Sequence, residues 1–471
     1  MSDPEKLEPC KATIRAYQVG FGDCFLLTFE YPEDENNSVQ ERHVLIDFGS
    51  TGMPAGVVAA EQMMSVANNI KDRCNGKLQI VVATHRHKDH ISGFATKKDE
   101  SGTGDIIKAL QPDIVIQPWT EDPLLKDAKL IERAVKPSAS QPLQMKQAFY
   151  VSSLTKMNAL ASTIATEIEH LGSKSFMPAL SPELKEQIEF LSEDNSLPNQ
   201  SAVVNLASMG KNHYVNFGYK LDVSQMLPGV TIHVLGPPNL HQHAKIRTQK
   251  SKDENEFWML YGAAGDFWKL QAASGDLCSS LTGGSGRLFP DADVFQDFLP
   301  SHNRWFVRQL RSLRGEQLLG LVRILDRAMN NTSVILLFEF GGKKLLFPGD
   351  AQIENWEYAL NDPAAVELLK DVCVYKVGHH GSRNATPKSL WGQFTRKQKE
   401  ETGQKDNENE PEKTVRLKTI NSTMKGKHGH IENNTEVPRT TLVDELTTQS
   451  DYKTTEEAAK ANELYIDVEI I

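Results

Sequence analysis

The sequence has no long hydrophobic run. Its longest uninterrupted apolar stretches, such as Val334–Phe338, contain only five residues, whereas a helix needs about 20 apolar residues to span a bilayer. The N-terminal stretch MSDPEKLEPCKATIR has no apolar segment of the kind found in signal peptides. These absences predict a protein without membrane segments, and we expect it in the cytoplasm.

Cysteine is scarce, and the charge balance is not positive. The five cysteines form no CxxC pair, and their odd number argues against a disulfide framework. A reducing compartment fits this cysteine usage best. The formal net charge is -10. A nucleic acid or phosphate ester would therefore have to bind at a locally positive or metal-bearing site.

Short β-branched and aromatic runs, bounded by Gly, Asp or Asn, predict strands along much of the chain. We expect strands at residues 12–19, 24–29, 43–48, 78–83, 201–207, 230–235, 333–340, 344–347 and 372–377. Apolar residues near helical spacing predict helices at 55–72, 144–171 and 304–329. A last strand, helix and strand are expected before the C-terminal YIDVEII.

Composition divides the chain into three stretches. Residues 1–98 and 330–471 are rich in expected strands, and the second stretch contains a charged, nearly apolar-free loop at about 397–413. The intervening residues 99–329 read as a partly helical insertion, with some core strands at about 201–238.

Three histidines and an aspartate crowd into THRHKDH, directly after the apolar run IVVA. His85 and His87 are two residues apart, so in an extended segment both rings point to one side. Asp89 and His90 follow where the chain must turn. Imidazole and carboxylate groups are ligands of zinc, manganese and iron. One ion cannot easily use all four groups from so short a segment, whereas two adjacent ions can.

Two later stretches place similar groups at expected strand ends. LLFPGD puts Asp350 just past an apolar strand, and VYKVGHHGS puts His379 and His380 just past another. Ligands at strand ends, brought together from distant sequence, are a common way for α/β folds to build sites. Pro-Gly-Asp is also ordinary turn chemistry, so Asp350 taken alone would read as a turn residue.

The set THRHKDH, LLFPGD and VGHHGS resembles the metallo-β-lactamase fold superfamily of hydrolases. VGFGDCFLL and NNTSVILLFEFGGKKLLFPGD are similar to segments of its ComEC-type branch. The resemblance covers about residues 12–93, 230–235 and 330–386. It implies an α/β fold, an αββα metallo-β-lactamase sandwich carrying a large, partly helical insertion, with a dinuclear metal site on one edge.

The resemblance also implies which residues bind metal. His85 and His87 would hold the first ion, Asp89 and His90 the second, and Asp350 would bridge the two. One residue of the HH pair would complete the second site. We favour His380 as this ligand, with His379 facing the substrate, and the opposite assignment stays open. Asp89 and His379 are the expected catalytic residues.

The same motifs also suggest which residues surround the metal ligands. Asp47 in HVLIDFGS is expected to accept a hydrogen bond from a ligand imidazole and so orient it, and Asp23 in GFGDC to act similarly. Many members of the wider superfamily have a further histidine where this chain has Asn330-Asn331-Thr332-Ser333. The first ion would then lack one protein ligand. We expect Asn331 to lie at the substrate.

These features predict a hydrolase with two divalent ions, zinc or manganese, as cofactors. Such an ion lowers the pKa of bound water and supplies hydroxide as the nucleophile, and a second ion shares the charge on the attacked group. The expected substrate is a phosphodiester in a nucleic acid, nucleotide or other phosphate ester. The alternatives are hydrolysis of a carboxylic ester, lactone or amide, and a metal-stabilised binding module without catalysis.

Overall fold

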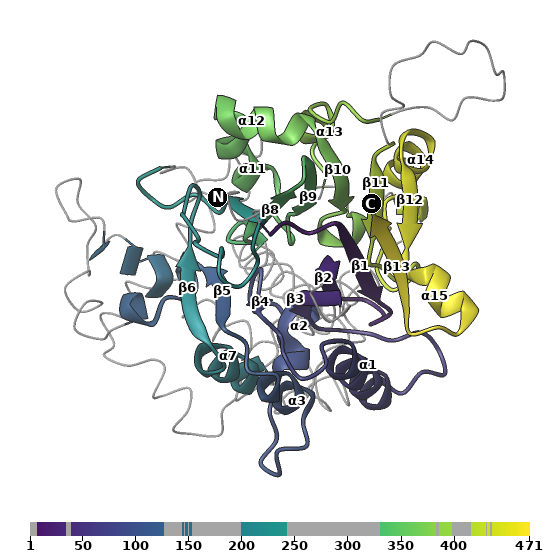
Figure 1. Cartoon of the computed structure of the whole chain (residues 1–471). Coiled ribbons are helices and arrows are strands. Elements are labelled where there is room, and N and C mark those ends of the chain that lie inside the picture. Colours follow the sequence, from purple (N-terminus) through teal and green to yellow (C-terminus); the bar gives the residue numbers. More distant parts are fainter. Residues whose placement is uncertain are drawn as a thin grey trace, which may run out of the picture. The chain divides into compact units, whose positions relative to one another are not determined.

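The computed structural model has an α/β fold built around two mixed β-sheets, as the sequence predicts (Figure 1). It describes residues 7–33, 39–126, 199–242, 330–382, 386–397, 416–429, 431–433 and 436–471, with 144–145, 147–148 and 150–152. The compact unit that contains both sheets consists of Met1–Leu125, Pro198–Ile246 and Met329–Ile471. A second unit, Lys126–Leu197 and Arg247–Ala328, lies almost wholly outside the described residues.

The first sheet has seven strands among the described residues. In spatial order they are β13 (Tyr465–Ile470), β1 (Lys11–Tyr17), β2 (Cys24–Glu33), β3 (Val39–Phe48), β4 (Ile80–Val82), β5 (Ile114–Pro118) and β6 (Lys211–Val215). The strands β13, β1, β2 and β3 pair antiparallel, whereas β3 to β6 pair parallel. Parallel neighbours need crossover connections, and helices supply them here.

The second sheet has six strands in the described part of the chain. Their order is β12 (Asp451–Thr454), β11 (Lys418–Asn421), β10 (Val372–Lys376), β9 (Lys343–Phe347), β8 (Ile335–Phe340) and β7 (Thr231–Gly236). The hairpin of β8 and β9 is antiparallel, and β9 to β12 run parallel. The carboxyl ends of β9, β10 and β11 therefore lie along one edge.

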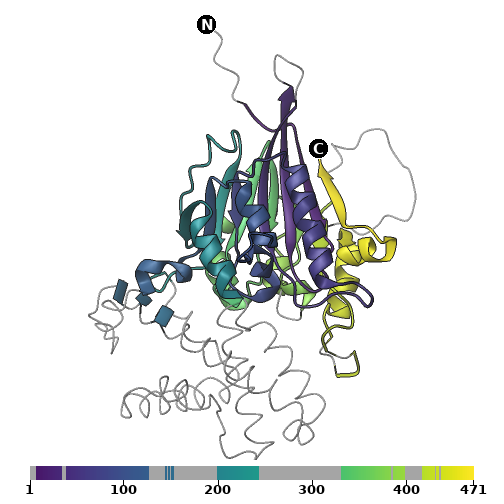
Figure 2. The same ribbon diagram turned by 90° about the horizontal axis from the view of Figure 1, so that it is seen from below.

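Side chains alternate between the two faces of each sheet, because successive residues of a strand point to opposite sides. In β2, Phe25, Leu27 and Phe29 join the core between the sheets, whereas Cys24 and Leu26 face the helices. Figure 1 shows the resulting layers, with the sheets packed together and helices outside, and Figure 2 looks onto the helices that cover the first sheet. The fold thus has one apolar core between the sheets and one on each outer face.

Amphipathic helices cover these outer faces. The first sheet is covered by α1 (Ala59–Arg73), α2 (Lys88–Ile91), α3 (Thr103–Ala109) and α7 (Asn199–Ser208). The second is covered by α11 (Ile353–Leu360), α12 (Pro363–Lys370), α13 (Lys388–Trp391) and α14 (Thr440–Gln449), and α15 (Thr455–Ala461) connects β12 to β13. None of the helices in the described ranges combines the length and apolarity needed to cross a bilayer.

Most expected elements appear near their predicted positions, but the strand predicted at 201–207 is wrong. That segment lies in helix α7. Ala202, Leu206 and Met209 share one helical face and pack beneath the first sheet, whereas Val204 is 62 % exposed. A short apolar run such as AVVNLA fits a strand or a helix, and packing decides between them. Of the helix predicted at 144–171, the described residues between 144 and 152 are helical.

Five helices and strands of the stretch read as an insertion belong to the compact unit, namely α3, β5, α7, β6 and β7. Helix α3 and strand β5 fall within residues 99–329, and β5 pairs with β4 in the first sheet. The strand predicted at 230–235 is β7 of the second sheet. The helix predicted at 304–329 and almost all of the charged loop at 397–413 lie outside the described residues.

The helical conformation of α7 can be tested with two substitutions. Leu206 is 1 % exposed, so Leu206→Ala should lower the free energy of unfolding by about 2–5 kcal/mol. Val204→Ala, the control, should change it by no more than about 0.5 kcal/mol because its side chain faces solvent. Urea unfolding followed by circular dichroism measures both. In a strand the two side chains would share one face, and equal losses would show that α7 is misassigned.

Candidate metal centre

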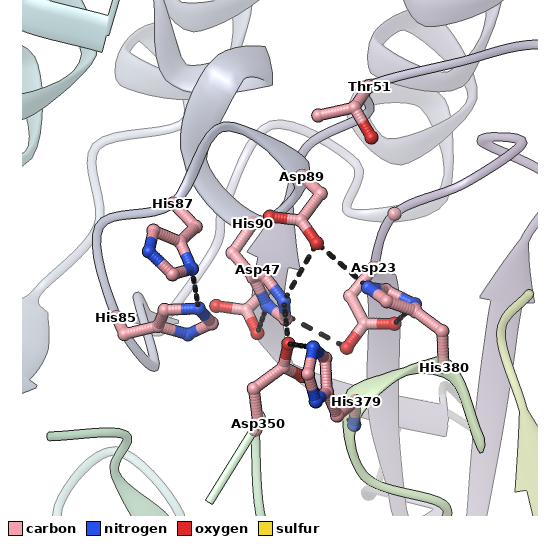
Figure 3. Close-up of polar contacts among 12 residues, drawn as sticks. Asp23, Asp47, Thr51, His85, His87, Asp89, His90, Asp350, His379 and His380 are labelled. Atoms are coloured by element: carbon pink, nitrogen blue, oxygen red, sulfur yellow. Dashed lines mark hydrogen bonds and ion pairs between the residues drawn. The ribbon is translucent and has the colours of Figure 1, made fainter. Parts of the chain in front are cut away.

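The candidate site lies where strands of both sheets end. Strand β4 leads through Thr84 to His85 and His87, and α2 then presents Asp89 and His90. Strand β9 leads to Asp350, and β10 leads to the pair His379 and His380. Thr84 O accepts a hydrogen bond of 2.9 Å from Val334 N, which ties the end of β4 to the beginning of β8. Figure 3 shows the side chains converging from these segments.

The first group of potential ligands contains Asp89, His90, Asp350 and His380. One nitrogen or oxygen of each lies within 4.8 Å of the others, and all four side chains are buried. His380 Nε2 is 2.8 Å from Asp89 Oδ2, and His90 Nε2 is 3.2 Å from Asp350 Oδ2. Imidazole nitrogens and carboxylate oxygens thus face a common centre.

A second group, His85, His87 and Asp89, lies beside the first. His85 Nε2 and His87 Nδ1 are 3.1 Å apart, so the two rings do meet on one side of the extended segment. Asp89 belongs to both groups, whereas Asp350 belongs only to the first. The carboxylate shared by the two groups is Asp89, and the bridging role expected of Asp350 stays a prediction.

Hydrogen bonds behind the rings fix which nitrogens face inward. His90 Nδ1 donates to Asp47 Oδ2 at 2.8 Å, and His380 Nδ1 donates to the carbonyl of Ser422 at 3.0 Å. Because Nδ1 of each ring donates away from the group, Nε2 is the atom that faces its centre and would give up its proton when a metal ion binds. Both rings are thus oriented as metal-binding imidazoles usually are.

Asp47 is held tightly at the end of β3. Its carboxylate accepts bonds of 2.7 Å from both the backbone N–H and the hydroxyl of Thr84, besides the bond from His90. Its backbone is left-handed, with φ of 56°, as is that of His379 (43°) and His380 (53°). Such conformations are costly for residues other than glycine and tend to occur at functional sites, where surrounding contacts maintain them.

Asp23, Asp47 and His90 form a third group with ligand spacing, but a cation or an N–H group of the protein already lies beside each of its two carboxylates. Asp23 forms an ion pair with the buried ammonium group of Lys376, and Asp47 takes the proton of His90 Nδ1. Asp23 Oδ2 and Oδ1 also lie 3.7 Å and 3.6 Å from Nδ1 of His90 and His380. We therefore regard this group as support for the other two.

Lys376 was not among the residues expected at the site. Its position in an expected strand could have indicated its importance, because a side chain in a strand buried on both faces has no route to solvent. A lysine in such a strand is exceptional unless it is paired with an acid.

The electrostatics of the centre favour a cation. Burial lowers the pKa of His85 well below its usual value and that of His87 to about 4, so both rings are neutral, as metal ligands must be. Burial also opposes charge on His90, but the carboxylates of Asp350, Asp89 and Asp47 outweigh it and raise its pKa. The centre of the first group therefore attracts positive charge.

His379 differs from its neighbour. Its side chain is 17 % exposed, whereas His380 is fully buried. Its Nδ1 lies 2.8 Å from Ser382 Oγ, and its Nε2 lies 3.9 Å from Asp350 Oδ2. The backbone N–H of His379 donates to Asp350 Oδ1 at 3.0 Å. Of the pair, His379 is the residue that solvent can reach.

Asn331, expected at the substrate, is only 4 % exposed, and its side-chain N–H donates to Glu354 Oε2 at 3.3 Å. Its contact with a substrate stays a prediction.

The donor set fits divalent ions. All six predicted ligands lie in the two groups, and each is buried. Among the described residues, Asp89 Oδ1 has no hydrogen-bond partner, although buried carboxylate oxygens normally have one. An oxygen left unpaired beside imidazole lone pairs is suited to a cation. The buried histidines and aspartates can therefore hold metal ions.

Asp47→Asn tests the support behind His90. The amide cannot serve both as the acceptor for Thr84 and as the negative partner of His90, so we expect metal affinity to fall by about 10–100-fold. Competition with a chelating dye measures this loss. Asp222→Asn, at an exposed turn where Asp222 accepts only from Ser224, should leave affinity unchanged. Equal affinity in both variants would show that Asp47 does not support the centre.

Comparison with known proteins adds no relative to this description: no protein-family model matches the chain, and no curated protein matches it.

Proposed function

We propose that this chain is a dinuclear metal-dependent hydrolase of the metallo-β-lactamase fold, ComEC-type branch, and that it cleaves a phosphodiester. The observation that carries the proposal is the pair of buried His/Asp groups joined by Asp89 at the ends of strands from both sheets. The residues of both groups lie in the sequence motifs that resemble the branch, and they follow one another in the same order along the chain. The layering of two sheets between helices is compatible with the sandwich of that branch.

His85 and His87 would hold one ion, and His90 and His380 the other. Asp89 belongs to both groups, and Asp350 Oδ2 lies 3.2 Å from His90 Nε2, so both carboxylates would be available as further ligands. Zinc and manganese both accept this mixture of nitrogen and oxygen ligands.

Divalent ions bound here would activate water as the nucleophile and offset the charge that develops on the attacked phosphoryl group. The chain's own residues then position the substrate and move protons. His379 lies on the side that solvent reaches, and its Nδ1 is occupied by the Ser382 hydroxyl. Its Nε2 is therefore the atom placed to exchange a proton with a leaving oxygen.

The proposal predicts metal-dependent turnover. Protein saturated with zinc or manganese should bind close to two ions and hydrolyse bis(p-nitrophenyl) phosphate, and chelation should abolish both properties reversibly. Asp350→Ala should reduce metal binding and turnover together, because it removes a negative charge facing His90. Mass spectrometry of the native protein and a substrate panel that includes nucleic acid and a lactone provide the measurements.

Two outcomes would contradict this prediction in different ways. Absence of bound metal would remove the basis of the whole proposal. Full metal occupancy without turnover of any ester in the panel would leave a metal-stabilised binding module as the function.

The two neighbouring histidines should separate in their effects. His380→Ala should weaken metal binding by on the order of tenfold or more, because a ligand should cost at least as much as its supporting residue. His379→Ala should keep its metal and lose mainly kcat, as expected for a group that acts in the transition state. Metal titration and steady-state kinetics of both variants decide between them. Tighter metal binding in His380→Ala than in His379→Ala would reverse the assignment.

A further inference from the structure

Lys376 carries a positive charge into the core directly beneath the candidate metal centre. On strand β10, Val374 faces the core between the sheets, whereas Tyr375 faces the helices. Alternation returns Lys376 to the inner side, where its ammonium group lies 5.9 Å from the ring centroid of Phe25. The residue is 2 % exposed. A charged group buried this deeply is retained only where other charges or hydrogen bonds compensate it.

Its partners come from the turns that build the site. The ammonium group pairs with the carboxylate of Asp23, lies 3.9 Å from Asp350 Oδ1, and donates to Gly349 O at 3.5 Å. It therefore lies against the oxygen of Asp350 that faces away from His90, since Oδ2 is the atom near His90 Nε2. Through Asp23 it is also linked to the rear nitrogens of His90 and His380.

The charges of the site do not cancel once it is loaded. Lys376 neutralises Asp23, which leaves the carboxylates of Asp47, Asp89 and Asp350. Ligand histidines are neutral, and two divalent ions carry four positive charges. Counted over the protein groups and the two ions alone, the metal-loaded centre would thus hold one positive charge more than its carboxylates balance. Without Lys376, the fourth carboxylate would cancel that excess.

We propose that Lys376 is a specificity-determining residue whose buried charge makes the loaded site favour an anionic substrate, such as a phosphodiester, over an uncharged one. This inference rests on the proposed function and deepens it. Its physical basis is that a charge in the protein interior is screened less than one at the surface. A fixed cation below the ions therefore still acts on a substrate bound above them.

A matched pair of substrates tests the inference. A p-nitrophenyl phosphodiester and the corresponding phosphotriester share a leaving group and differ by one negative charge. Lys376→Met should lower the ratio of kcat/KM for the diester to that for the triester by roughly tenfold, as the loss of one partly screened charge implies. Lys376→Arg keeps the charge and should keep the ratio, even if its size lowers stability.

Binding of inorganic phosphate supplies a second readout that needs no turnover. Calorimetry on metal-loaded protein, with metal content measured on the same samples, should show roughly tenfold weaker phosphate binding in Lys376→Met. The control is Lys344→Met on neighbouring strand β9, where Lys344 pairs with Asp371 at 3.6 Å, and it should change neither readout.

Equal losses on the diester and the triester in Lys376→Met, with phosphate binding unchanged, would reduce Lys376 to a structural role and overturn the inference. If Lys376→Met does not fold, Asp23→Asn provides the test. It leaves the lysine charge uncancelled and should shift both readouts the opposite way, and a shift in the same direction as charge removal would contradict the inference. Failure of the proposed hydrolase activity is distinguishable, since metal-loaded protein would then turn over neither substrate while phosphate binding still reports on Lys376.

Discussion

A carboxylate cannot remain charged in a protein core without partners, and this constraint organises the whole site. Asp23, Asp47, Asp89 and Asp350 are all buried at the edge where the sheets meet. Each is matched by imidazole, ammonium or N–H groups from another segment, so no segment can move without exposing an unpaired charge. Asp47 and the Ser422 carbonyl accept from Nδ1 of His90 and His380 respectively, so the Nε2 atoms of both rings point inward. Metal-binding geometry and structural stability are thus properties of one network.

The two sheets contribute unequally to that network. The first sheet supplies Asp47 at the end of β3 and the dense run from His85 to His90 after β4. The second supplies single residues from successive strands, Asp350 after β9 and His380 after β10. The first sheet therefore offers most of the potential metal ligands by itself, and packing of the second sheet against it adds the remaining ones.

Much of this site follows from the sequence because its information is local. The spacing of His85, His87, Asp89 and His90 implies a cluster whatever the rest of the chain does, and LLFPGD and VGHHGS each mark a strand end. Lys376 was missed because its importance depends on the direction in which β10 faces and on Asp23, which is distant in sequence. The misassignment of α7 has a related cause. Its short apolar run fits a strand and a helix equally well, and packing against the first sheet decides between them. Long-range packing, rather than residue type, decided both cases.

The distance along the chain between Asp89 and His380, 291 positions, has a thermodynamic consequence. An ion shared by these side chains would act as a reversible cross-link between early and late parts of the sequence. Closing so long a loop in the unfolded chain would cost much entropy, so folding of the two sheets has to bring the two side chains together. Binding that exists only in the folded state also stabilises that state in proportion to the logarithm of the free ion concentration. If the site binds metal, the stability of the packed sheets would therefore depend on the availability of metal.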